Sequence, residues 1–157
     1  MCLMCQGWTY EQVAELQKKH IDDFGWSIVA VEGSRSAAPF AYTVGLTRFH
    51  DHPELVVTGL DHVNTGLLLN GLGREVRAGR RFTAGEVQQR DGGRRYQFVR
   101  VADPRRLVHA QEMYADVAGP VPALQVVHST TTGRWPWDRD YPGGRRSQPL
   151  LGRPPNL

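Results

Sequence analysis

Apolar side chains recur at helical spacing in two stretches of the first half of the chain. The first stretch begins at Thr9, where Thr9 and Gln12 fit a capping box, and ends at Gly25, which suits a left-handed C-terminal cap. The second stretch follows Asp61, a natural N-cap, and carries a leucine-rich pattern as far as Val76. We expect a helix over each stretch. A third helix is expected from Asp103-Pro104 to Gly119, because proline is favoured at the first helical position.

Runs of apolar and β-branched residues, bounded by Gly, Pro and polar positions, predict the strands. The expected strands cover 26–31, 40–46, 54–60, 85–89, 96–101 and 123–129.

The resulting order, α-β-β-β-α-β-β-α-β, predicts an α+β fold with a mostly antiparallel sheet covered by about three helices. The connections 47–53 and 90–94 are too short for parallel crossovers, so strands 40–46 and 54–60 are expected to pair antiparallel. We expect one domain over 1–157, with a Cys-x-x-Cys segment at 1–8 and a surface tail rich in Pro, Gly and Arg at 139–157.

Composition places the chain among ordinary globular proteins. It has 157 residues, of which 40% are hydrophobic and 22% charged. No window approaches 18 uninterrupted apolar residues, and the N-terminus lacks the basic and apolar regions of a secretory signal. We therefore expect a cytoplasmic protein without a membrane span, and no complete catalytic signature identifies it as an enzyme.

Positive charge concentrates in the middle of the chain. The formal net charge is +3, yet residues 74–106 hold ten arginines and four acidic residues. A basic face of this kind suits a phosphate or nucleic-acid contact. The alternative is a solvated surface, which we favour because the overall charge is small and no nucleic-acid-reading module is recognisable.

Two cysteines and two histidines are candidate metal ligands. Cys2 and Cys5 form a Cys-x-x-Cys, and His50 and His52 are two apart in a stretch expected to be an extended loop, so their side chains can face one side. Together they would form a tetrahedral Cys2His2 set suited to zinc. The cysteines can equally form a redox pair or be an idle reduced pair, and the histidine stretch can be a plain polar connector.

A second cluster suggests acid–base chemistry. His52 and Glu54 flank Pro53 at the start of a strand, and a carboxylate beside an imidazole can orient it or share proton transfer. Tyr42 and Thr43 on the neighbouring strand supply hydroxyls that can line the same polar pocket. The competing interpretation places Tyr42 in the core with its hydroxyl satisfied at an edge.

Two tryptophans flanking a proline form the densest aromatic motif, Gly133-Arg134-Trp135-Pro136-Trp137-Asp138. Side chains two apart in an extended segment point the same way, so both rings are expected on one surface, that of the 40–60 hairpin. Asp138 is expected to accept backbone amides. Trp137 and Asp138 are candidate ligand-binding residues, while the alternative is a cover over the core with Trp135 structural and Trp137 partly exposed.

Eight short strings of the chain form a distinctive ordered set. They are Phe40 to Leu46, His52 to Leu60, Leu68 to Asn70, the N-terminal Cys-x-x-Cys, Gly25-Trp26, Leu124 to Val127, Gly133 to Asp138 and Gln148 to Gly152. This set resembles an uncharacterised bacterial family catalogued as domain of unknown function 4262. His128 departs from the pattern, because the family often has Trp there. The resemblance implies a single-domain cytoplasmic protein common in actinobacteria, and it implies no reaction.

Three functional hypotheses follow. The preferred one is a small accessory or binding protein that holds a metal ion through its N-terminal cysteines. The second is an enzyme acting on a small polar substrate through His52, Glu54 and Tyr42. The third is a phosphate or nucleic-acid binder using the arginine-rich region 74–106. Neither the partner nor the oligomeric state follows from the sequence.

Overall fold

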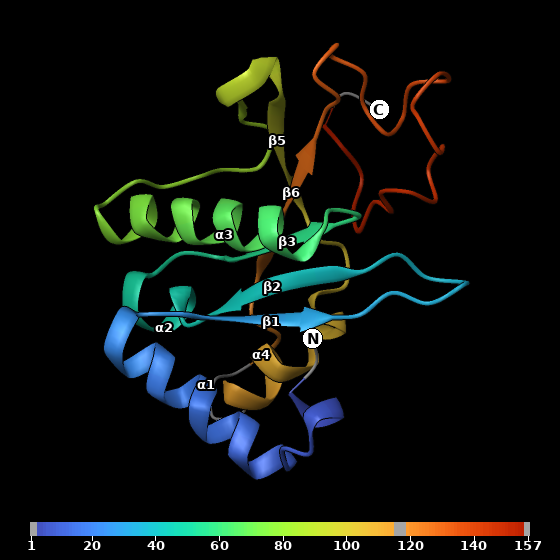
Figure 1. The fold of residues 1–157 in the computed structure, drawn as a ribbon. Helices are drawn as coiled ribbons and strands as arrows, with labels where there is room; N and C mark the ends of the chain where they lie inside the picture. Colours follow the sequence, from blue (N-terminus) through green and yellow to red (C-terminus); the bar gives the residue numbers. More distant parts are fainter. Residues whose placement is uncertain (1–2, 115–118, 156–157) are drawn as a thin grey trace.

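Six strands form one mixed sheet in a computed structural model that describes residues 3–114 and 119–155 (Figure 1). The strand order is β1-β2-β3-β6-β5-β4. β3 and β6 pair in parallel, whereas the other four neighbouring pairs are antiparallel. The strands are β1 (Ser27–Val31), β2 (Phe40–Val44), β3 (Glu54–Thr58), β4 (Val87–Gln89), β5 (Arg95–Arg100) and β6 (Ala123–His128).

Four α-helices cover the two faces of this sheet. They are α1 (Tyr10–Phe24), α2 (Leu46–His50), α3 (His62–Arg77) and α4 (Val108–Met113). One buried cluster joins α3 to the sheet, and a second joins α1 and α4 to the opposite face. Because β3 alternates between these faces, Leu55 and Val57 belong to the first cluster and Val56 to the second. The expected α+β architecture is confirmed.

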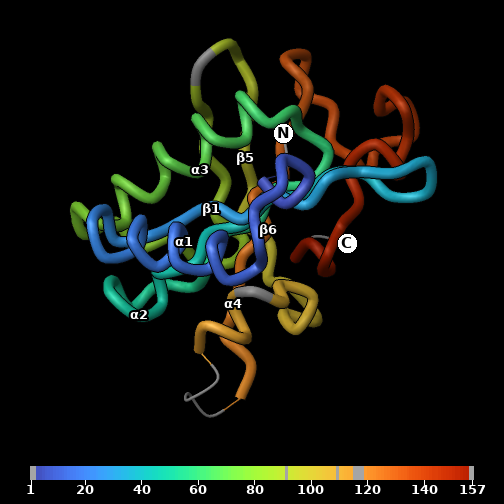
Figure 2. Tube along the Cα trace, turned by 60° about the horizontal axis from the view of Figure 1, so that its bottom comes forward, coloured from blue at the N-terminus to red at the C-terminus, as the bar shows by residue number. Residues whose placement is uncertain are grey.

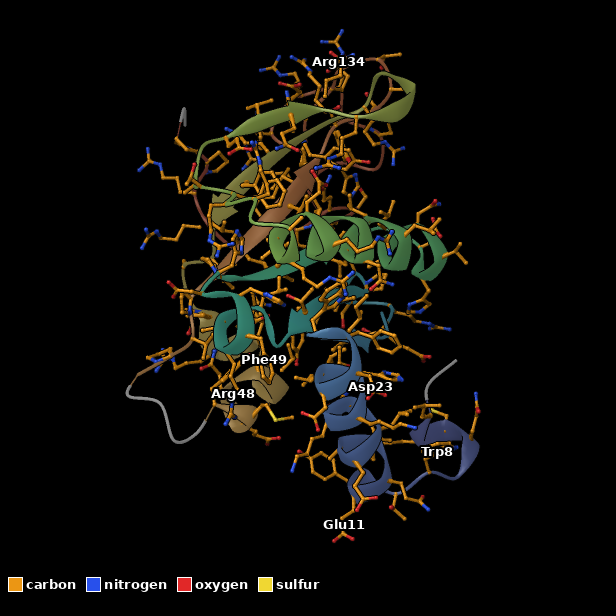
Figure 3. The ribbon with its side chains drawn as sticks, turned by 90° about the vertical axis from the view of Figure 1, so that its left-hand side faces the viewer. Trp8, Glu11, Asp23, Arg48, Phe49 and Arg134 are labelled. Atoms are coloured by element: carbon orange, nitrogen blue, oxygen red, sulfur yellow. The ribbon has the colours of Figure 1, made fainter. Side chains whose placement is uncertain are left out.

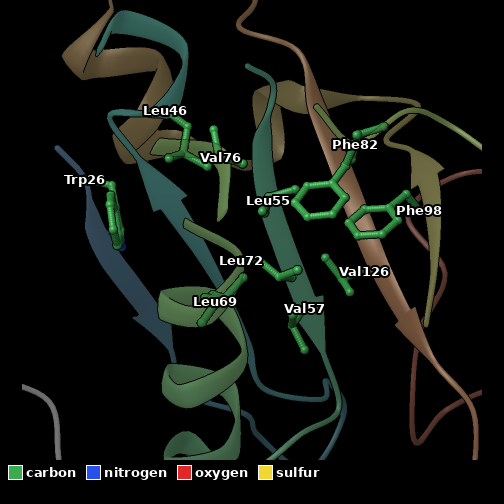
Figure 4. Packing of buried hydrophobic residues seen from close by; sticks show 12 residues of the cluster. Trp26, Leu46, Leu55, Val57, Leu69, Leu72, Val76, Phe82, Phe98 and Val126 are labelled. Carbon is green, nitrogen blue, oxygen red and sulfur yellow. The ribbon is translucent and has the colours of Figure 1, made fainter. Parts of the chain in front are cut away.

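The α3 side of the core is built on aromatic contacts (Figure 4). The rings of Phe82 and Phe98 stack with centroids 4.5 Å apart, beside Leu55 and Leu72. Gly73 lets α3 approach β1 closely, because a Cβ there would lie 2.6 Å from the Trp26 ring. Glycine at this position therefore allows close packing of α3 on the residue that precedes β1.

Helix ends follow the sequence signals. The Thr9 hydroxyl accepts from the Gln12 amide at 3.2 Å, and the Gln12 side chain completes the capping box. Gly25 ends α1 with φ of 95°. The Asp61 carboxylate accepts the Asn64 amide at 2.9 Å and so caps α3. These local predictions are confirmed because each depends on residues three or four apart.

The pairing of strands 40–46 and 54–60 is also confirmed, since β2 and β3 are antiparallel neighbours. The expectation of an extended loop over 47–53 is wrong, because α2 covers Leu46–His50. Gly45 ends the preceding strand with φ of 126°, and a Cβ there would lie 2.6 Å from the Gly25 carbonyl oxygen. Close contact with the end of α1 thus turns the chain into a helix at Gly45.

The third predicted helix is shorter than expected. A 3-10 helix covers Pro104–Arg106, and α4 ends at Met113. Residues 115–118 of the predicted helix lie outside the described residues. None of the described helices combines the length and the apolar character needed to span a membrane.

The segment after β6 returns beside β6 (Figure 1) and is bound there by the buried side chains of Gln125 and Gln148. Gln125 donates to the Pro149 carbonyl at 2.8 Å and accepts the Leu151 amide at 2.7 Å. Gln148 accepts the His128 amide at 2.9 Å and donates to the His128 carbonyl at 2.8 Å. The position of this segment relative to the sheet is therefore fixed by side-chain hydrogen bonds.

Candidate functional site

Glu54 opens β3, and its side chain is 0% exposed. Its Oε1 accepts the Thr43 hydroxyl at 2.9 Å and the Leu46 amide at 3.1 Å. Its Oε2 accepts the Thr47 amide at 2.9 Å and the Tyr114 hydroxyl at 3.2 Å. The carboxyl group thus closes the first turn of α2 and joins it to the residue that follows α4.

Burial and backbone hydrogen bonding act on the pKa values of this network in opposite directions. Burial raises the pKa of the Glu54 carboxyl, although hydrogen bonds from Thr47 and Thr43 act in the opposite direction. Burial, and then the nearby Glu54, raise the pKa of the Tyr114 hydroxyl. Because each carboxyl oxygen accepts at least two donors from within the chain, the arrangement serves the fold directly.

His52 is held by the backbone on both sides of its ring. Its Nε2 accepts the Phe82 amide at 3.0 Å, so Nδ1 carries the proton and donates to the Pro53 carbonyl at 2.7 Å. Burial lowers the pKa of His52, which keeps the ring neutral. Both ring nitrogens of His52 are therefore hydrogen-bonded to the backbone.

Of the predicted acid–base cluster, the structure brings together Thr43 and Glu54. Tyr42 is buried in the cluster that faces α1 and α4, and its ring stacks on Phe40 with centroids 6.2 Å apart. His52 contacts Phe82 near the other face of the sheet. A reaction at His52, Glu54 and Tyr42 stays a prediction, and the structure buries all three side chains.

The predicted zinc ligands lie on different elements. Cys2 is outside the described residues, and Cys5 is exposed in the 3-10 helix Met4–Gln6, before α1 begins. The His50 ring lies against Gly25 at the far end of α1, about 22 Å along a helix of this length. Across the residues that the structure describes, no group of three His, Cys, Asp or Glu is placed to hold a metal ion. Zinc binding by Cys2 and Cys5 stays a prediction.

The tryptophan motif lies at the end of the molecule opposite the N-terminal segment, as the positions of Arg134 and Trp8 show (Figure 3). The Trp135 and Trp137 rings stack on each other with centroids 5.0 Å apart and are half-buried. Asp138 accepts the Trp135 amide at 2.8 Å, as expected. The contact beneath Trp135 comes from Arg95 of β5, 5.7 Å from the ring centroid, and not from the expected 40–60 hairpin.

A hollow of about 600 Å³ opens between α1, β1 and α3, a volume in the range typical of small-molecule sites. We call it the Trp26 hollow. Its lining residues are His20, Phe24, Trp26, Ser27, Ile28, Asn70, Arg74 and Arg77.

The floor of the Trp26 hollow is fixed by neighbouring elements. The Trp26 indole nitrogen donates to the Asn70 side-chain oxygen at 3.0 Å. The Arg77 guanidinium lies over the indole, 5.2 Å from the ring centroid, and donates to the Phe24 carbonyl at 3.2 Å. Because Arg77 is held on both sides, its remaining N–H groups are presented in a defined orientation.

The rim of the Trp26 hollow combines charge with an aromatic surface. Arg74 is exposed and makes no ion pair with any residue that the structure describes. Phe24 is 57% exposed, and the His20 ring meets it edge to face at 6.2 Å. The lining includes no acidic residue among those described. The site can therefore attract an anion and pack against a planar group.

Sequence reasoning missed this site. Arg74 and Arg77 were grouped with a general basic region, and Gly25-Trp26 appeared only within the family resemblance. The available signal was the three-residue spacing of Arg74 and Arg77, which places both on one side of a helix. The pairing of that side with Trp26, 48 positions before Arg74, needed the tertiary fold.

These observations define a class: an α+β protein with a half-open, positively charged hollow between a helix pair and an edge strand. The chain belongs to the family described as Domain of unknown function (DUF4262), whose model matches residues 20–142. The resemblance found in the sequence is thereby confirmed, and the matched range includes the whole Trp26 hollow. Neither a curated protein nor a solved structure shows significant similarity to the chain.

Proposed function

We propose that the protein binds a small organic anion in the Trp26 hollow. The observation that carries this proposal is the pair Arg74 and Arg77, two permanently charged groups on a hollow whose described lining contains no carboxylate. Cations left without carboxylates in a concave site attract anions more strongly than the same groups on a flat surface.

The ligand should carry a planar group next to its charge. Phe24 offers an exposed aromatic ring at the rim, and the Asn70 amide group offers hydrogen bonds beside it. Guanidinium groups match the geometry of carboxylates and phosphates by donating two parallel hydrogen bonds. A planar ring bearing a carboxylate or a phosphate therefore fits the site best.

Isothermal titration calorimetry with two probes, AMP and salicylate, tests the proposal. Each joins a planar ring to an anion, and at least one should bind saturably, whereas adenosine should bind much more weakly than AMP. Arg74→Gln should lower the affinity about tenfold or more, because a hydrogen bond to a charged group contributes about 1.5–3 kcal/mol.

Arg139→Gln is the matched control, since Arg139 is also exposed but does not line the hollow. It should leave the affinity unchanged. The proposal is wrong if neither anion binds saturably, or if Arg74→Gln and Arg139→Gln have the same effect.

A further inference from the structure

A second concave surface lies at the other end of β1, where three segments distant in sequence meet. They are the 33–39 loop between β1 and β2, the 3-10 helix Pro104–Arg106, and the segment 145–151. Figure 2 shows the light-blue loop beside the red C-terminal segment. The hollow between them has a volume of about 910 Å³. We call it the arginine hollow; the lining residues used below are Arg35, Arg106, Arg145, Arg146, Phe40 and Leu151.

Each of the three segments contributes arginine to the arginine hollow. Arg35 comes from the loop, Arg106 from the 3-10 helix, and Arg145 and Arg146 from the C-terminal segment; all four are exposed. The described lining contains no acidic residue. Asp103, the nearest acid in sequence to Arg106, pairs with Arg105 at 2.8 Å and also interacts electrostatically with Arg106. The charged residues of the lining itself are all arginines.

The walls of the arginine hollow are held in place by hydrogen bonds, some of them from side chains of β3 and β6. The Pro149 carbonyl accepts from Thr58 at 2.8 Å and from Gln125 at 2.8 Å, which fixes the chain just after Arg145 and Arg146. The loop is closed by the Ser34 amide, which donates to the Ala37 carbonyl at 2.8 Å. The arginines therefore extend from a preformed concave frame.

The floor of the arginine hollow is apolar. Phe40 and Leu151 are half-buried there, and the Phe40 ring is supported by its stack on Tyr42. A basic rim above an aromatic and aliphatic floor is the arrangement by which proteins hold single-stranded nucleic acid, with phosphates on the cations and bases on the rings. A duplex keeps its bases stacked inside and cannot use such a floor.

We infer that the arginine hollow binds single-stranded nucleic acid through its phosphates, without reading its sequence. Arginines from three segments supply cations for the phosphates, and Phe40 provides the surface for a base. This site is separate from the Trp26 hollow, so either proposal can fail without the other.

Fluorescence anisotropy with a labelled single strand of about 20 thymidines tests the inference on the full chain. The strand should bind at about 50 mM salt and weaken steeply towards 200 mM, because phosphate contacts release counterions. The double variant Arg145→Gln, Arg146→Gln should weaken binding about tenfold or more. It should also reduce the salt slope by about 1.4, at about 0.7 per lost phosphate contact on a single strand.

The double variant Arg48→Gln, Arg139→Gln is the matched control, since it removes the same charge from exposed positions that do not line the hollow. It should retain nearly full binding and slope, as should Arg74→Gln in the Trp26 hollow. Circular dichroism melts of all variants check that each is folded. The inference is overturned by absence of binding at low salt, by equal losses in the two double variants, or by tighter binding of a duplex of the same length.

Discussion

The polar groups inside the sheet and the arginines around it differ in where their partners come from. Inside, Glu54 accepts hydrogen bonds from α2, from β2 and from the residue after α4, and Gln148 binds both backbone groups of His128. Outside, Arg74 and Arg145 face hollows whose described linings contain no carboxylate.

This difference separates residues that hold the fold from residues available to a ligand. A buried polar group without a partner is costly, so the chain itself supplies the partners of Glu54 and Gln148. An exposed arginine is solvated by water and needs no partner, so it can bind a ligand without disturbing the core. Substitutions at the inner groups should therefore lower stability, and substitutions at the outer arginines should lower binding alone.

The largest effect is expected at Glu54. Glu54→Gln turns an amide NH2 towards donors such as the Thr47 amide and the Tyr114 hydroxyl, which then lose their acceptor. We expect a loss of about 3–5 kcal/mol in the free energy of unfolding, measured by urea denaturation. Glu86→Gln, which breaks a partly exposed ion pair with Arg80, should cost about 1 kcal/mol or less. Equal losses would contradict the structural role of Glu54.

Gln148→Ala should be the next most damaging change. It leaves the buried His128 amide and carbonyl without their side-chain partner, which should cost about 2–3 kcal/mol in the same assay. Gln89→Ala is the control on the exposed side of β4 and should stay within about 0.5 kcal/mol of the parent chain. An unchanged midpoint for Gln148→Ala would mean that the Gln148 hydrogen bonds to His128 add nothing to stability.

Smaller losses are expected in the tryptophan motif. Trp135→Ala removes a stack on Trp137 and a contact with Arg95, but both rings are half-buried. We expect each substitution to lower the free energy of unfolding by about 1–2 kcal/mol. This is less than the loss of about 3–5 kcal/mol typical of replacing a fully buried aromatic residue by Ala. Thermal melts of Trp135→Ala and Trp137→Ala measure these losses of stability. A loss of about 3 kcal/mol or more in either variant would mean that the motif holds the fold as Glu54 and Gln148 do.

His52 should make stability depend on pH. Burial lowers the pKa of His52 in the folded chain below the ordinary histidine value of about 6.5, so the unfolded chain binds the proton more readily. The stabilisation is present above pH 6.5 and is lost as the pH falls through the lowered pKa. Urea midpoints between about pH 7.5 and 5 should therefore fall less for His52→Gln than for the parent chain. His62→Gln, at an exposed position on α3, should behave like the parent chain.

The smallest effect on stability is expected at Arg74. Arg74→Gln should shift the unfolding free energy by less than about 0.5 kcal/mol, because its side chain is exposed and makes no ion pair within the described chain. The same protein sample should lose the anion affinity proposed for the Trp26 hollow. If Arg74→Gln is destabilised, Arg74 holds the fold as Glu54 and Gln148 do. The separation between buried fold-holding residues and exposed ligand-binding arginines would then be wrong.

The local sequence was enough to predict the strands, the two long helices and the caps of those helices. The capping box at Thr9, the Gly25 cap and the Asp61 cap all act within one helical turn, so neighbouring residues suffice to predict them. The short connection after β2 likewise required an antiparallel return to β3. The sequence also predicted that Asp138 accepts a backbone amide, and the observed contact with the Trp135 amide again spans three residues.

Which polar residues are buried and which surround a hollow depends on packing between distant segments. Glu54 and His52 were predicted to do chemistry because of their residue types, but packing surrounds each of them with donors and acceptors of the chain. The helix at 46–50 depends on the Glu54 carboxyl and on the approach of Gly45 to Gly25, neither of which is visible in the local pattern.

The two hollows were likewise beyond the reach of a linear pattern. The basic region 74–106 looked like one face, yet the fold divides it: Arg74 joins Trp26, whereas Arg106 joins Arg35 and Arg145. Local sequence fixes contacts between residues a few positions apart, because the backbone geometry of a turn or helix sets their distance. Contacts between distant segments depend on how the whole sheet packs, and the sites of this protein are made of those contacts.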